Sequence, residues 1–174
     1  MGGSFPLFIE DLSPCTYVAS SRSDCETLKA VGWLAWGHPY TEREIQLPET
    51  RFVQLLRLLV DPWQPLFFMG GHECEFCPEE PHEDLHAYYR RHQIERDGLV
   101  VDFGANNLYV PGEGCVYVAP SMIAHYVDVH RYEPPVAFWE AVMNCPEMGS
   151  ETYKQALIAN GPANEAWVRE VQAE

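Results

Sequence analysis

Two cysteines and two histidines have the residue types and the spacing of a metal site. Cys74 and Cys77 form a C-x2-C pair, and His125 and His130 stand in H-x4-H spacing within "AHYVDVH". Zn²⁺ prefers four tetrahedral ligands, and thiolates together with imidazoles satisfy it. A C-x2-C turn lets two thiolates point at one ion, and a helix returns the second imidazole to nearly the same face as the first. The pattern therefore predicts a Cys2His2 zinc site.

Two further residues are rivals for a place in this site. His72 precedes Cys74 by two residues, so the H-x-C-x2-C run places it either on the same ion or just outside it. Cys145, in "MNCP", is another candidate for the fourth ligand. The other histidines are expected to be ordinary loop or solvated residues, namely His38, His82, His86 and His92.

The C-x2-C pair has two competing interpretations, a redox pair or two cysteines that fall close together by chance. A thioredoxin-like pair places its first cysteine at the start of a helix after a strand. Here Glu75, Glu79 and Glu80 lie between or just after the cysteines, and their negative charges oppose a reactive thiolate. We therefore favour metal binding. The remaining cysteines are expected to be small buried apolar residues, namely Cys15, Cys25 and Cys115.

The ligand set favours a structural metal over a catalytic one. Cys2His2 is the usual closed combination of a structural zinc, whereas a catalytic zinc keeps an open position beside an acid or base. Glu73 and Glu75 flank the cysteines, which leaves a metal-dependent hydrolase as an alternative. Neither the H-E-x-x-H motif nor the zinc-deaminase pattern is present. A third alternative is a regulator that responds to metal or redox state through the two cysteines.

The flanking sequence must supply elements that bring the two halves of the site together. Residues 49–60 predict the clearest helix, because apolar residues recur at helical spacing after Pro48. Residues 108–110 and 116–118 predict a hairpin, and a helix carrying both histidines follows over 120–132. Strands are also expected at 65–70 and 99–103, a short helix at 26–31, and C-terminal helices at 135–144, 150–160 and 164–174.

These elements predict an α+β fold with a small antiparallel sheet, a zinc-stapled unit of knuckle, hairpin and helix, and a helical C-terminus. A length of 174 residues fits a single domain. Within it we distinguish an irregular N-terminal segment (1–25), a helix with the zinc-stapled core (48–145) and C-terminal helices (146–174). The acidic segment 78–98 carries no recognisable role.

The net charge of −15, from 11 Lys+Arg against 26 Asp+Glu, opposes binding to nucleic acid or to an anionic membrane. It suits solubility, or an acidic face that docks a basic partner. Aromatic residues gather in "GWLAWGHPY" and "DPWQPLFF", which are interpreted either as core or as a partner-binding surface. No export signal, myristoylation motif or membrane-spanning run is visible, so a cytoplasmic protein is expected.

Several runs resemble a family of uncharacterised bacterial proteins over roughly residues 27–158. The shared patterns are G-x-H-x-C-x2-C, in "GGHECEFC", and V-P-x-x-G-x-x-Y-x-A-P-x-M-I-x-H-Y, in "VPGEGCVYVAPSMIAHY". The resemblance implies a small cytosolic bacterial protein with a zinc centre. It also implies that Cys74, Cys77 and His125 belong to the shared pattern, with His72 and His130 as companions.

The sequence thus favours a non-enzymatic binding module. One concrete form is an acidic, immunity-type protein that covers a basic toxin, because the charge balance suits such a partner. The hydrolase and the regulator remain the alternatives.

Overall fold

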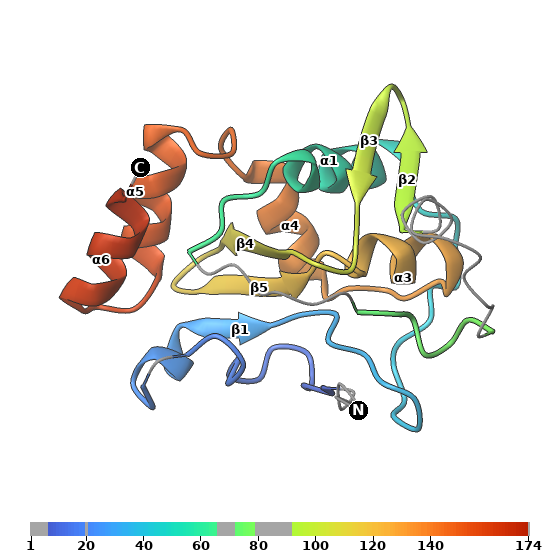
Figure 1. Ribbon diagram of the computed structural model, residues 1–174, viewed down its shortest axis with the longest axis horizontal. Coiled ribbons are helices and arrows are strands. Elements are labelled where there is room, and N and C mark those ends of the chain that lie inside the picture. Colours follow the sequence, from blue (N-terminus) through green and yellow to red (C-terminus); the bar gives the residue numbers. More distant parts are fainter. Residues whose placement is uncertain (1–6, 20, 66–71, 79–91, 174) are drawn as a thin grey trace.

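A computed structural model describes residues 7–19, 21–65, 72–78 and 92–173 (Figure 1). The predicted α+β class is confirmed, with helices packed around a three-stranded sheet and a two-stranded hairpin beside it. The strands are β1 (Leu28–Ala30), β2 (Gln93–Arg96), β3 (Leu99–Asp102), β4 (Asn107–Pro111) and β5 (Val116–Pro120). The helices are the 3₁₀ turn η1 (Asp24–Glu26), α1 (Glu49–Val60), α3 (Ile123–Val129), α4 (Val136–Asn144), α5 (Glu151–Asn160) and α6 (Glu165–Gln172).

The central sheet has the strand order β1-β5-β4. Strands β4 and β5 form the predicted antiparallel hairpin, in a register that pairs Asn107 with Pro120 and Pro111 with Val116. Strand β1 adds to the other edge of β5 in parallel, with Leu28 opposite Val116. The sheet is therefore an antiparallel hairpin extended by one parallel strand.

The short helix expected at 26–31 is wrong. The chain makes one 3₁₀ turn over Asp24–Glu26 and then enters β1. Leu28 and Ala30 are buried while Lys29 between them is half-buried, which is the alternation of a strand. Because β1 pairs with β5, a tertiary contact overrides the local helix preference of this segment.

The hairpin β4–β5 is buried on both faces. One face belongs to a core cluster with α1, α3 and α4, and the other to a second cluster with the N-terminal segment, α5 and α6. The side chains alternate between the two clusters along each strand. Leu108, Val110, Tyr117 and Ala119 face the first cluster, and Tyr109, Val116 and Val118 face the second.

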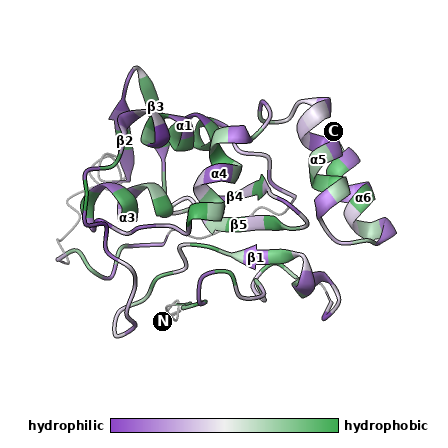
Figure 2. Cartoon of the chain, turned by 180° about the vertical axis from the view of Figure 1, so that it is seen from behind, coloured by the Kyte–Doolittle hydropathy of each residue, from purple (hydrophilic) through white to green (hydrophobic). Residues whose placement is uncertain are grey.

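Helix α1 packs its apolar face into the first cluster. Six of its residues are buried: Phe52, Val53, Leu55, Leu56, Leu58 and Leu59. In Figure 2, α1 carries hydrophobic and hydrophilic residues in turn, as an amphipathic helix does. The prediction of this helix is confirmed, as are those of the three C-terminal helices. The helix expected over 120–132 is present but shorter, since α3 spans Ile123–Val129 and does not include His130.

Some expectations fall on residues outside the described part of the chain. They are the strand at 65–70 beyond its first residue, most of the acidic segment 78–98, and the residues His82 and His86. Among the helices that the structure describes, none combines the length and the apolar character needed to cross a membrane.

Gly32 brings the chain after β1 against the first turn of α3. Its φ of +74° lies in the left-handed region, and a Cβ there would stand 2.9 Å from Cγ1 of Ile123. Ile123 is fully buried, so its side chain has little room to retreat. A glycine is thus required both by the backbone and by the contact with α3.

Replacing Gly32 should distinguish the cost of left-handed backbone strain from the cost of the contact with Ile123. Gly32→Ala is expected to lower the free energy of unfolding by about 1–3 kcal/mol, from left-handed strain together with overpacking. The matched control is Gly37→Ala, where φ is +86° but nothing lies within 4 Å of the added Cβ. Urea denaturation measures both variants. Equal losses at the two positions would show that the contact with Ile123 costs nothing.

Candidate metal centre

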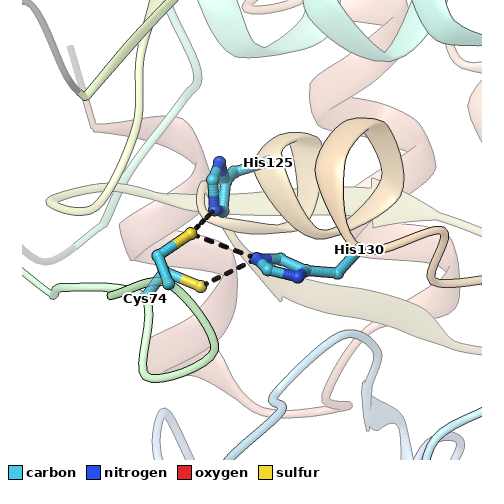
Figure 3. A group of neighbouring side chains, drawn as sticks. Cys74, His125 and His130 are labelled. Carbon is cyan, nitrogen blue, oxygen red and sulfur yellow. Dashed lines mark hydrogen bonds between the residues drawn. The ribbon is translucent and has the colours of Figure 1, made fainter. Parts of the chain in front are cut away.

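Four side chains from two distant segments converge on one point (Figure 3). Cys74, Cys77, His125 and His130 each offer one ligand atom, and these atoms all lie within 4.8 Å of one another. All four residues, which we call the Cys/His cluster, are half-buried. The fold therefore brings together the four residues whose types and spacing predict a metal site.

The cysteines are presented by a tight turn that is tied to the sheet. The N–H of Cys77 donates to the carbonyl of Cys74 at 3.3 Å, which closes the turn. Just before it, the N–H of His72 donates to the carbonyl of Gly104 at 2.7 Å. The N–H of Gly104 in turn donates to Oγ of the buried Ser121, at 2.9 Å. Because Ser121 stands between β5 and α3, this chain of bonds sets the turn beside the helix.

The histidines come from α3 and the residue that ends it. His125 lies within the helix and His130 is its C-cap, with φ −99° and ψ 8°. The expectation that one helix returns both imidazoles to nearly the same face is wrong, because residues five apart in an uninterrupted helix point about 140° away from each other. The change of backbone direction at His130 therefore lets the second imidazole return toward the first.

The end of α3 is held by several hydrogen bonds. The N–H groups of His130 and Tyr132 both donate to the carbonyl of Tyr126, at 3.1 and 3.0 Å. The guanidinium of Arg43 donates to the carbonyl of Val127 at 3.0 Å. Arg131 takes the left-handed conformation, with φ 55°, that turns the chain away from the helix. These contacts fix the position of His130.

Within the cluster, sulfur and nitrogen atoms lie at contact distance. Cys74 Sγ is 3.2 Å from Nε2 of His130. Cys77 Sγ is 3.3 Å from Nε2 of His125 and 3.3 Å from Nε2 of His130. Figure 3 shows the same arrangement, with both imidazoles pointing from the helix toward the cysteine turn.

The rival ligands lie elsewhere among the described residues. His72 is not a member of the cluster and contributes through its backbone N–H. Cys145 caps α4 and packs partly buried against both hydrophobic clusters, and burial raises the pKa of its thiol to about 12. His38 is exposed and stacks on Phe8, with ring centroids 4.0 Å apart.

Aromatic side chains surround the cluster, and sequence reasoning assigned none of them to it. Phe76, between the two cysteines, has its ring centroid 5.4 Å from that of His130 and 5.8 Å from that of Tyr126. On the other side, Phe103 stacks on His125 at 5.2 Å. The position of Phe76 inside C-x2-C was a usable signal, whereas Phe103 became a neighbour only through the fold.

Burial favours the neutral forms of Cys74, His125 and His130 in the protein without a metal. It lowers the pKa of His125 to about 4, assisted by the positive charges that His130 and His92 would carry, and it also lowers the pKa of His130. Burial raises the pKa of Cys74 to about 11, against the lowering effect of the amides of Phe76 and Cys77. Neutral imidazoles are ready to donate lone pairs, and a bound cation would favour the thiolate of Cys74 instead of its thiol.

The donor set determines what chemistry this arrangement could perform. Two sulfur and two imidazole nitrogen atoms form a soft, four-donor group suited to a tetrahedral divalent metal. Their half-buried position would shield such an ion from water. The cluster therefore has the composition and compactness of a metal centre.

Comparison with known proteins places this centre in a family. A family model described as "Domain of unknown function (DUF7919)" matches residues 7–143, a range that contains the whole cluster. No curated protein and no solved structure matches the chain. The match carries no activity with it.

The pKa of His125 has a measurable consequence in protein kept in a metal-free buffer with chelator. The unfolded imidazole takes up a proton near pH 6.5, but the folded one only near pH 4. Because the unfolded chain then binds more protons, stability should fall as the pH drops from about 6.5 toward 4. His125→Gln should weaken this pH dependence. NMR titration of the His125 ring tests the premise, and a midpoint near 6.5 would contradict it.

Proposed function

The chain belongs to the DUF7919 family, whose function is unknown, so we infer its role from the residues of its own site. We propose that the Cys/His cluster holds one structural Zn²⁺ ion. The observation that carries the proposal is the approach of four soft donors to within 4.8 Å, two from the cysteine turn and two from the end of α3. The ion would staple these two segments together.

Zinc suits this site better than the other common metals. A tetrahedral set of two thiolates and two imidazoles is typical of zinc, whereas Mg²⁺ and Ca²⁺ take oxygen ligands. A neutral imidazole is the form that binds a metal, and burial favours that form at His125. Zinc would release protons from the thiols when it binds, because thiolates are the ligands.

A structural role for the metal is supported by the number of protein ligands and by the hydrogen bond that the nearby Glu75 makes. Four protein ligands fill a tetrahedral shell and leave no position for a substrate or an activated water. Glu75, one candidate base of a hydrolase, has its Oε2 2.7 Å from the backbone N of Trp36 and accepts a hydrogen bond from it. This bond gives Glu75 a role in positioning the chain, which weighs against hydrolysis.

The redox-responsive regulator receives less support than the metal staple. A reactive cysteine needs a lowered thiol pKa, and burial raises the pKa of Cys74 to about 11. The same group becomes a thiolate when a cation lies beside it. The electrostatics of the turn thus favour a metal ligand over a free nucleophile.

We further propose that the protein as a whole acts as a non-enzymatic binding module and that its partner is a basic protein. The net charge of −15 supports an acidic surface that would attract such a partner and speed its association. An immunity-type protein that covers a basic toxin is one form of this proposal.

Removing one thiol should abolish the stabilisation by metal. Cys74→Ser is expected to lose zinc-dependent stability, so that its melting temperature no longer differs between zinc and chelator, because metal-binding energy is folding energy. The matched control is Cys25→Ser, a half-buried cysteine outside the cluster, which should keep the full difference. Thermal unfolding with and without chelator measures this effect.

Co²⁺ substitution provides a second readout for the same variants. The parent protein and Cys25→Ser should give the absorption of tetrahedral, thiolate-bound cobalt, and Cys74→Ser should lose it. The proposal fails if the purified protein binds no metal and melts at the same temperature with or without chelator.

The coordination shell separates the staple from the hydrolase. X-ray absorption of the zinc-loaded protein should show two sulfur atoms at about 2.3 Å and two nitrogen atoms at about 2.0–2.1 Å. A shell of three protein ligands and one oxygen would instead favour an open catalytic site.

A further inference from the structure

The two residues between the cysteines also contact a separate loop. Glu75 accepts the backbone N–H of Trp36 through Oε2, at 2.7 Å. The ring of Phe76 lies 6.1 Å from that of Trp36 and 5.5 Å from that of Tyr40. The cysteine turn therefore positions residues 35–40, which we call the Trp36 loop.

The Trp36 loop has further attachments. His38 stacks on Phe8 of the N-terminal segment. The hydroxyl of Tyr40 donates to the carbonyl of His130 at 3.2 Å, which ties the end of the loop to a member of the cluster. The loop is thus held against the cysteine turn on one side and against the end of α3 on the other.

Trp36 is left exposed by a loop that is otherwise firmly attached. Its side chain is 72% exposed, whereas Trp33, three residues earlier, is 7% exposed and donates Nε1–H to the carbonyl of Val118. The sequence leaves two interpretations of the aromatic run "GWLAWGHPY", either core or a partner-binding surface, and its two tryptophans differ in this respect. Trp33 belongs to the core and Trp36 does not. A large aromatic side chain held in place but uncovered has the character of a binding anchor.

The charge beside Trp36 indicates what could cover it. The Glu75 carboxylate lies against the backbone of the loop, where its Oε2 accepts the N–H of Trp36. An indole face attracts cations, and a neighbouring carboxylate strengthens that preference. The site therefore fits a guanidinium or ammonium group rather than an anion.

We propose that Trp36 and Glu75 form a docking site for an arginine- or lysine-bearing segment of a basic protein. A cationic side chain would lie on the indole face of Trp36 and bond the Glu75 carboxylate. The net charge of −15 supplies long-range attraction for such a segment, while this pair supplies a specific point of contact. The inference rests on the proposed function, because it names where the basic partner binds.

The same geometry makes docking depend on the metal. Glu75 and Phe76 lie between two of the proposed ligands, so zinc binding would fix the residues that hold the Trp36 loop. Without the ion, the turn loses its staple and the loop loses a rigid support. The docking site is therefore complete only in the metal-loaded protein.

Calorimetric titration of the zinc-loaded protein with an oligo-arginine peptide tests the proposal. The parent should bind it, and an oligo-citrulline peptide, which lacks the charge, should bind far more weakly. Trp36→Ala and Glu75→Gln should each weaken binding by roughly tenfold, because each removes one part of the contact. Glutamine keeps an oxygen that can accept the N–H of Trp36, so the second variant removes charge without releasing the loop.

Matched controls separate this contact from general attraction to an acidic protein. Ile45→Ala removes another exposed apolar side chain, and Glu165→Gln removes one carboxylate from the first turn of α6. Both should bind the peptide within twofold of the parent. Equal weakening by Glu75→Gln and Glu165→Gln, or no effect of Trp36→Ala, would overturn the docking site.

The two proposals fail in different ways. Trp36→Ala and Glu75→Gln should retain the Co²⁺ absorption of the parent, since neither is a ligand. If the protein binds metal but these variants bind the peptide as well as the parent does, the docking site is rejected and the metal staple is not. A parent that binds no metal would reject the staple, and peptide binding unchanged by chelator would reject the dependence of docking on the ion.

Discussion

The two-sided burial of the β4–β5 hairpin constrains the other elements of this protein. Because its side chains alternate between two hydrophobic clusters, each face needs its own cover. Helices α1, α3 and α4 cover one face, and the N-terminal segment with α5 and α6 covers the other. Helix α3 follows β5 almost directly, so the hairpin also sets where His125 and His130 can lie.

Much of this arrangement is predictable from local patterns. Periodicity identifies α1, paired apolar runs around Pro111 identify the hairpin, and ligand types at metal spacing identify the Cys/His cluster. Strand β1 escaped prediction because three residues carry little periodic signal and the pairing that makes them a strand lies far along the chain. The bond between Glu75 and the Trp36 backbone was equally hidden, since it joins residues 39 apart in the sequence.

The cysteine turn contacts two separate parts of the protein. Its cysteines face the histidines of α3, while the residues between them face the Trp36 loop. Burial favours the neutral thiol of Cys74, and a cation nearby would favour the thiolate instead. The same short turn thus contacts both the Cys/His cluster and a loop with an exposed tryptophan.

The alternation of the hairpin also bears on where this protein can be divided. The family match ends at residue 143, yet Tyr153, Leu157, Trp167 and Val171 belong to the cluster on the second face of the sheet. A fragment cut at that boundary would keep the cover from the N-terminal segment but lose that from α5 and α6, including the contacts of Tyr153 and Trp167 with Tyr109. Such a fragment would expose part of this apolar face and tend to associate through it, even though its Cys/His cluster is intact. The region defined by family similarity is therefore smaller than the unit that buries both faces of the sheet.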